Sequence, residues 1–233
     1  MRKKTKNLSK AEYRACHQQA LLAEMKLQLS HTNCVLIIDF SENYSCKYTS
    51  ETQSVHFSAS RSQVTMHTAV LYYRTTEAEA ELQCKSFCTV SDNLRHYPAA
   101  IWVHLKPVLY FVAKNVPAME SINIRSDGLT TQYRNKYNFA IFAQLGSITK
   151  FKKATWNFTE SGYCKRPADG IGGSVKHQLD HVVSLGRHIT NAQVVFTALS
   201  SQSVNSTDMY IITDSNIADT DEQFAASNDS REQ

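Results

Sequence analysis

The chain has 233 residues, of which 42% are hydrophobic and 20% are charged, and its net charge at pH 7 is +4. This composition is that of a folded protein, and the length allows one substantial core but not two large domains. No run approaches the roughly 18 apolar residues that a membrane span needs, and no apolar stretch of signal-peptide type follows the basic N-terminus. We therefore expect a nuclear or cytoplasmic protein without a membrane partner.

The charges are unevenly distributed along the chain. Residues 205–233 carry seven acidic side chains against Arg231 alone, so residues 1–204 have a larger positive net charge than the whole chain. Such an excess is compatible with a polyanionic partner. The acidic stretch has few large apolar residues after Ile217, and we expect it to be disordered. We divide the chain into a basic N-terminal segment with a helix (1–31), a folded core (32–204) and an acidic tail (205–233).

The predicted elements begin with a helix over residues 9–29, which contains no Gly or Pro and opens at Ser9. Strand 33–40 and a hairpin of residues 53–59 and 63–73 follow, and residues 85–90 are a candidate for a further short strand. Next comes a helical stretch that Ser91 and Asp92 could cap and that runs through Pro98 to Val116, and Pro107 should kink or divide it. Strand 120–126, helix 130–145, strand 154–160 and helix 170–185 complete the series, whereas residues 191–200 are ambiguous.

This order consists of an antiparallel opening followed by βαβα units, which is the pattern of ribonuclease H-like folds. The sequence therefore predicts an α/β fold with a ribonuclease H-like mixed sheet, a three-stranded antiparallel opening and helices on both faces.

Three acidic residues stand where apolar runs end or a Gly-rich turn enters a helix. Asp39 follows four aliphatic residues, Asp127 ends the run before Gly128, and Asp169 enters the helix 170–185. Because sites in α/β folds tend to lie at the C-terminal ends of strands, we expect the three carboxylates to converge. Converging carboxylates bind hard divalent cations, so these residues predict a metal-dependent phosphoryl-transfer enzyme or the remnant of one.

Each acid also has an alternative interpretation. Asp39 could cap a turn at a strand end, and Asp127 with Gly128 could be an ordinary turn. The third acid could instead be Glu160, at the end of its own strand. Asp180 would lie roughly 16 Å beyond Asp169 along the helix, too far to share its ions.

Cysteine and histidine give a second metal hypothesis. A zinc site would need the pair Cys84 and Cys88 to meet the pair His177 and His181, which lie one helical turn apart. Nothing else in the sequence joins these pairs, so reduced structural thiols are the better interpretation. His56, His67 and His177 are further candidates for substrate contacts, although a lone histidine is more often structural.

Basic side chains lie beside the second and third acids and suit a phosphate backbone, whereas the alternative is a solvated helix face. They are Arg134, Lys136, Lys165, Arg166 and Lys176. Four of the seven glycines lie between residues 162 and 173, which indicates tight turning or close backbone approach.

With these motifs the sequence resembles transposon-derived proteins of animal genomes that have a DDE-type, ribonuclease H-like transposase core. The resemblance covers about residues 32–200 and rests on residues 39–46, 53–56, 64–67, 126–128, 132–136, 156–158 and 169–173, with Lys176. It implies cleavage and transfer of DNA strands by two-metal chemistry with Mg²⁺, or Mn²⁺ as a substitute. In that scheme Asp39 would contact both ions, and Asp127 and Asp169 one ion each. DNA is the implied partner, and homo-oligomerisation is left open.

Two departures from the family pattern stand against catalysis. The family usually has a His-Gly-Lys-Gly-like run before the third acid, whereas residues 163–166 are Tyr-Cys-Lys-Arg. We also expect the family's usual upstream DNA-binding region to be lacking. Two rival hypotheses follow: a hydrolytic nuclease of the same fold, and a degenerate or domesticated module that binds nucleic acid or protein without catalysis.

Overall fold

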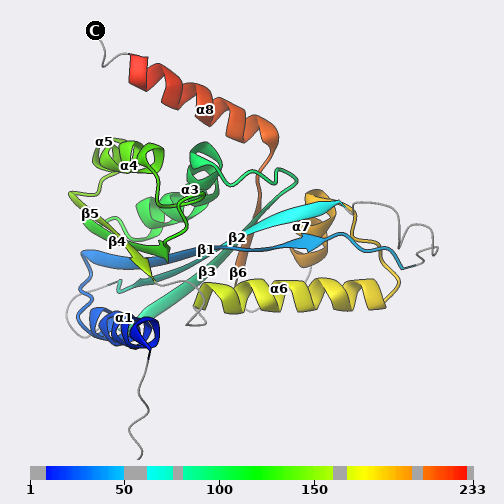
Figure 1. Cartoon of the computed structure of the whole chain (residues 1–233), viewed down its shortest axis with the longest axis horizontal. Helices are drawn as coiled ribbons and strands as arrows, with labels where there is room; N and C mark the ends of the chain where they lie inside the picture. Colours follow the sequence, from blue (N-terminus) through cyan, green and yellow to red (C-terminus); the bar gives the residue numbers. More distant parts are fainter. Residues whose placement is uncertain (1–8, 50–61, 76–80, 160–166, 201–206, 230–233) are drawn as a thin grey trace, which may run out of the picture.

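The computed structural model describes residues 9–49, 62–75, 81–159, 167–200 and 207–229 (Figure 1). Its strands are β1 (Asn33–Ser45), β2 (Gln63–Tyr73), β3 (Gln83–Ser91), β4 (Ser121–Asp127), β5 (Lys153–Thr159) and β6 (Thr207–Ile211). Its helices are α1 (Lys10–Leu27), α3 (Pro98–Asn115), α4 (Lys136–Ala143), α5 (Leu145–Ile148), α6 (Pro167–Ser184), α7 (Ala192–Ser200) and α8 (Asp214–Asp229).

The described strands form one six-stranded sheet in the order β5-β4-β1-β2-β3-β6. β2 is antiparallel to both β1 and β3, whereas β4 and β5 extend the sheet beyond β1 in parallel. This is the ribonuclease H-like arrangement, so the predicted fold class is confirmed. β6 adds a further parallel strand beside β3.

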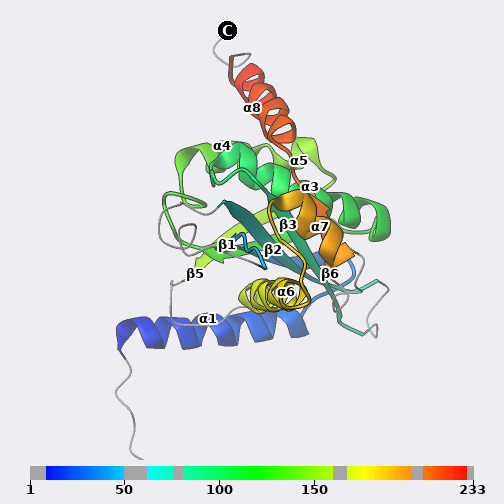
Figure 2. The ribbon, with the colours of Figure 1, turned by 90° about the vertical axis from the view of Figure 1, so that its right-hand side faces the viewer.

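Helices cover both faces of the sheet. On one face, Leu36 and Ile38 of β1 pack in a cluster with Ile101 and Leu105 of α3, and α4 and α5 lie on the same side (Figures 1 and 2). On the other face α6 lies under the central strands and α1 lies beside it (Figure 2). The described helices include none that is long and apolar enough to cross a membrane.

The helix boundaries follow from local signals. Ser9 and Glu12 form a capping box at the start of α1, in which each side chain accepts a hydrogen bond from the backbone N–H of the other residue. Pro98 occupies the first turn of α3, where its missing N–H costs nothing. Pro107 does not divide α3, which is continuous from Pro98 to Asn115 because buried residues on both sides of the proline pack on the sheet.

The tail is the largest difference from expectation. Residues 205–233 were expected to be disordered, but they contain β6, which joins the sheet, and α8, which packs against α3. Two apolar side chains explain why this segment is folded, because Ile212 and Ile217 are buried against Ala99 and Val103 of α3. α8 then projects away from the rest of the molecule (Figure 1).

Other elements differ in detail. The helix expected over residues 130–145 begins only at Lys136, where Asn135 caps it, and ends as the separate α4 and α5. Residues 191–200 hold the helix α7, and β1 continues to Ser45. The predicted strand 53–59 lies outside the described residues.

Candidate functional site

Asp39 and Asp127 lie on neighbouring parallel strands. The pairing of β1 with β4 runs from Asn33 opposite Ser121 to Ile37 opposite Arg125, and the same offset sets Asp39 opposite Asp127 two residues later. Neighbouring strands are about 4.8 Å apart, and side chains alternate between faces, so both carboxylates project from the same edge on the same face. The pairing therefore places these two residues at the same level of neighbouring strands, and their joint role as metal ligands stays a prediction.

That face is the one covered by α1 and α6. Val35 and Ile37, which share the face of Asp39, pack with Ala168 of α6 and with residues of α1. Arg125, which shares the face of Asp127, donates a hydrogen bond from Nη2 to the backbone oxygen of Gln18 in α1 at 3.1 Å. Asp39 lies between Ile37, which packs with Ala168, and Ser41, which meets Gly172, so it is beside the N-terminal half of α6. Asp127 is the last residue of the neighbouring strand β4.

Asp127 is buried and has a structural contact. Its side chain is 8% exposed, and its Oδ1 accepts a weak hydrogen bond from the backbone N–H of Leu129 at 3.4 Å. Thr159 of β5 donates to the backbone oxygen of Ser126 at 3.0 Å, which holds the end of β4 against its other neighbour. The contact with Leu129 agrees with the ordinary-turn interpretation of Asp127 with Gly128.

Asp169 lies in the first turn of α6, which is bound closely to β1. Ala168 is fully buried, and a side chain on Gly172 would overlap Ser41 of β1. The buried stripe is Ala168, Gly172, Val175, Leu179 and Val182, and Ile171 is only half-buried. Asp169 itself is exposed on the flank of this helix.

The flank that carries Asp169 faces the extended end of β1. Lys176, seven residues further, shares this flank, and its Nζ lies 3.6 Å from Oε2 of Glu42. Asp180 has a different role, because its Oδ1 accepts hydrogen bonds from Tyr44 Oη at 2.9 Å and Lys47 Nζ at 2.6 Å. Asp180 therefore fastens α6 to β1 and does not contribute to a site with Asp169.

Among the described residues, no three Asp, Glu, His or Cys side chains are placed to hold a metal ion. The donor chemistry of Asp39 and Asp127 fits a hard cation, and the convergence of Asp169 on them stays a prediction. Glu160, Lys165 and Arg166 lie outside the described residues.

The same search excludes the zinc hypothesis within the described part of the chain. Cys88 is fully buried, and burial raises the pKa of its thiol to about 12, which opposes the thiolate that zinc requires. His177 and His181 are exposed on α6.

The predicted basic residues that the structure describes stand at two places. Arg134 and Lys136 are exposed after β4, and the Lys136 ammonium lies 5.0 Å from the ring centre of Tyr137. Lys176 lies beside the end of β1, as described above. Both places border the edge that carries Asp39 and Asp127.

A histidine cluster under this edge was not predicted as a unit. Phe40, next to Asp39, points to the α3 face, where His96 stacks on it at 3.9 Å between ring centres, and His67 and His104 contact it edge-on. His96 also bonds Gln132 at 3.0 Å, which ties the segment after β4 to β1. Sequence spacing gives no signal for this cluster, because its histidines come from β2, α3 and the loop between β3 and α3.

Burial controls the protonation of these histidines. Burial, followed by the neighbouring imidazoles, lowers the pKa of His67, and burial, then His96, lowers the pKa of His104 to about 3. Burial also lowers the pKa of His96. In the described structure neither ring nitrogen of His67 has a hydrogen-bond partner, whereas Nδ1 of His104 lies 2.6 Å from the hydroxyl of Thr89. The lowered pKa values favour the neutral form of all three rings near pH 7.

Comparison with known proteins gives a family and several distant structural likenesses. A model of the family DUF8701, described as a domain of unknown function, matches residues 18–232. No curated protein matches the sequence.

Solved structures that resemble the chain include the crystal structure of the mariner Mos1 paired end complex with Mg, at 14% identity and a TM-score of 0.33, covering 88% of this chain and 65% of that one. The human cytomegalovirus terminase nuclease domain has 12% identity and a TM-score of 0.34, over 80% of this chain and 67% of that one. The crystal structure of the Mos1 strand transfer complex has 11% identity and a TM-score of 0.33, covering 97% of this chain and 63% of that one. The chain thus spans less than two thirds of either Mos1 chain, and at such TM-scores these likenesses carry no information on function.

Proposed function

The chain belongs to the DUF8701 family of domains of unknown function, and we propose that it is a DDE-type, transposase- or integrase-like core that cuts and transfers DNA strands with a divalent metal ion. A DNA substrate would place its activity in the nucleus. The observation that carries the proposal is the position of Asp39 and Asp127 at the same edge of the parallel pair β1 and β4.

Asp39, Asp127 and Asp169 would hold the metal ions, with Glu160 as the alternative third ligand. Bound magnesium, or manganese in its place, would activate the attacking water or 3′-hydroxyl and stabilise the leaving oxygen. The close fit of Gly172 against Ser41 supports this role for Asp169, because it leaves α6 little freedom to move relative to β1.

The chain's basic residues would bind the DNA backbone. Arg134 and Lys136 are placed to contact phosphates on the β4 side of the edge, and Lys176 on the α6 side. Lys165 and Arg166 belong to the same proposed set. Lys176 would first have to leave Glu42, whose side chain is 93% exposed, and an exposed ion pair of this kind is weak.

The main alternative is a binding module without catalysis. It is favoured by one specific observation, because the described residues assemble no three-ligand group. The substitution of the usual His-Gly-Lys-Gly-like run by Tyr-Cys-Lys-Arg at residues 163–166 agrees with it. A hydrolytic nuclease that cuts without joining would use the same carboxylates.

The proposal is tested by incubating end-labelled DNA with the full chain and Mg²⁺ or Mn²⁺. Metal-dependent cutting that Asp39→Asn and Asp127→Asn both abolish supports the proposal, and joined products separate a transposase from a nuclease. DNA binding without cutting in either metal would establish the binding module instead.

The same assay identifies the third acid. Asp169→Asn should abolish cutting and leave the fold and most DNA binding intact, whereas Glu160→Gln should have the smaller effect. The reverse result would assign the third position to Glu160.

A further inference from the structure

A basic and aromatic stripe lies on α3, far from the carboxylates. Lys106, Tyr110 and Lys114 recur every four residues and therefore share one face of the helix. All three are exposed, and Tyr110, at 68%, is among the most exposed aromatic side chains that the structure describes. The ammonium of Lys114 lies 5.9 Å from the ring centre of Tyr110.

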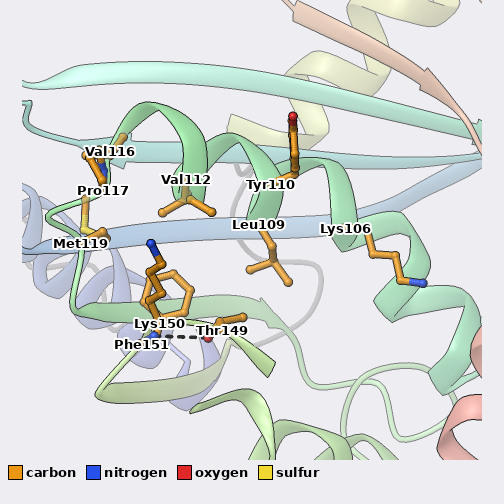
Figure 3. Close-up of a pocket in the computed structure, with 11 residues that line it drawn as sticks. Lys106, Leu109, Tyr110, Val112, Val116, Pro117, Met119, Thr149, Lys150 and Phe151 are labelled. Atoms are coloured by element: carbon orange, nitrogen blue, oxygen red, sulfur yellow. Dashed lines mark hydrogen bonds between the residues drawn. The ribbon is translucent and has the colours of Figure 1, made fainter. Parts of the chain in front are cut away.

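A pocket of about 470 Å³ lies beside this stripe (Figure 3). Four buried residues line it: Val112 of α3, Val116 directly after α3, Met119 and Phe151. Lys106 and Tyr110 border it from α3, and Lys150 extends toward Val112 from the segment before β5 (Figure 3). The volume is within the range of sites for small organic groups, which is about 300–1,000 Å³.

This surface lies at the opposite end of the sheet from Asp39 and Asp127. The pocket contacts Met119 and Phe151, which directly precede β4 and β5, whereas Asp127 ends β4. The two surfaces are therefore separated by the length of the strands.

The lysines of this surface are not tied up in direct ion pairs, although Lys106 lies beside the acidic helix α8. No carboxylate of the described residues forms an ion pair with Lys106, Lys114 or Lys150, and the Nζ of Lys106 donates instead to the neutral hydroxyl of Thr220 at 2.7 Å. Lys152, nearby, pairs with Glu120 at 2.6 Å. Lys114 also stabilises the C-terminal turn of α3, but this role does not account for Lys106, Lys150 or the exposed ring of Tyr110.

We propose that this surface, formed by Lys106, Tyr110, Lys114, Lys150 and the adjacent pocket, binds unpaired nucleic acid. The lysines contact phosphates, one base stacks on Tyr110, and a neighbouring base enters the pocket. Aromatic rings between basic side chains are the usual means of binding a single strand without sequence preference.

The spacing of the charges favours a nucleic-acid strand over a small anion. Lys106 and Lys114 are about 12 Å apart along the helix axis, which is too far for one carboxylate to contact both. A strand carries a phosphate at every nucleotide and an aromatic base beside it, which matches the lysines, the ring and the apolar pocket together. An acidic protein segment would use the lysines but would not need Tyr110.

The experiment measures binding of the full chain to three labelled probes in the presence of EDTA. The probes are oligo-dT of about 15 nucleotides, which is within the size range of single-strand sites, a duplex of the same length, and poly-L-glutamate. EDTA removes metal-dependent binding at the carboxylate edge, so the result does not depend on whether the chain cuts DNA.

Two variants and one control decide the outcome. The first variant combines Lys106→Gln, Lys114→Gln and Lys150→Gln. It should weaken oligo-dT binding about tenfold and lower the slope of log affinity against log salt concentration by about 2. The matched control removes three exposed charges elsewhere, with Lys10→Gln, Arg95→Gln and Arg187→Gln, and should change both values less. Tyr110→Ala should weaken oligo-dT binding about fivefold or more while leaving duplex binding almost unchanged.

Three results would overturn the proposal. They are equal losses in the lysine variant and its control, equal effects of Tyr110→Ala on single strand and duplex, and poly-L-glutamate binding as tight as that of oligo-dT. The last result would identify an acidic protein as the partner. Circular dichroism of each variant shows that it is folded, which is expected because every substituted side chain is exposed.

Discussion

The two ends of the central sheet differ in charge and in what they need from solution. The edge with Asp39 and Asp127 presents two neighbouring carboxylates, which repel a phosphate unless a cation lies between them. The opposite end presents Lys106, Lys114 and Lys150, which attract phosphate directly. Under the two proposals, one fold would make a metal-dependent and a metal-independent contact to the same polymer, and substitutions should remove each contact separately.

The largest expected effect separates the two ends by metal dependence. Asp39→Asn should reduce Mg²⁺-dependent cutting by about 100-fold or more, because metal stabilisation of the transition state is worth several kcal/mol. Oligo-dT binding in EDTA should stay within twofold of the unmodified chain. If Asp39→Asn lowered the affinity for oligo-dT in EDTA as much as it lowered the cutting rate, the two ends would not be independent.

Substitutions in α6 should affect the carboxylate edge without affecting the lysine end. Gly172→Ala adds a methyl group that overlaps Ser41, and such overpacking costs about 1–3 kcal/mol of unfolding free energy. Because it separates α6 from β1, it should also lower metal-dependent cutting.

Gly173→Ala is the matched control for this prediction, since a Cβ there meets no heavy atom within 4 Å. It should leave stability unchanged or raise it by up to about 1 kcal/mol, because Ala is a better helix former than Gly. Chemical denaturation measures both variants, and equal stability of the two would contradict the tight contact between α6 and β1.

Acid should destabilise the chain through the histidine cluster under the carboxylate edge. A histidine whose folded pKa is lowered contributes stability that is complete above its unfolded pKa of about 6.5 and is lost as the pH falls toward the folded pKa, which for His104 is about 3. For each fully buried histidine, the free energy of unfolding should therefore fall by about 1.4 kcal/mol for each pH unit below 6.5.

Replacing one member of the cluster tests this pH dependence. Between pH 6.5 and pH 4.5, His67→Leu should reduce the slope of unfolding free energy against pH by about the contribution of one histidine, because leucine does not titrate. Unfolding free energies measured by urea titration at several pH values give the slope, and an unchanged slope would show that His67 is not neutral in the folded chain.

The smallest expected effect concerns the ion pair between Lys176 and Glu42. Glu42→Gln should change the unfolding free energy by less than about 1 kcal/mol, because Glu42 is exposed to solvent. It should raise duplex affinity slightly at low salt, since it frees Lys176. An unchanged affinity would indicate that Lys176 does not contact DNA.

Much of the carboxylate edge could be predicted from the sequence because it depends on short-range signals. An apolar run that ends in an aspartate identifies a strand, and the order of the elements then sets β1 beside β4. The run did not mark the C-terminal end of β1, which continues beyond Asp39 to Ser45. The direction of Asp169 could not be predicted, since it depends on small residues, Ala168 and Gly172, that let α6 approach β1. These residues have weak propensity signals, and only the packed structure shows their role.

The lysine end and the tail could not be predicted for a different reason. Lys106, Tyr110 and Lys114 appear in the sequence as the ordinary outer face of a helix, and the pocket beside them needs Phe151 from a distant segment. The low hydrophobicity of residues 205–233 predicted disorder, but the burial of Ile212 and Ile217 on α3 fixes α8 there. Contacts between distant segments decide both features, and composition does not report them.

The central claim, that Asp39 and Asp127 form a cation site, is tested most directly by titrating Mn²⁺ into the full chain in a calorimeter. The account predicts a binding event that Asp39→Asn and Asp127→Asn each weaken strongly, and that Asp219→Asn, which removes an exposed carboxylate on α8, leaves unchanged. Binding that is identical in the unmodified chain and in both edge variants would contradict it.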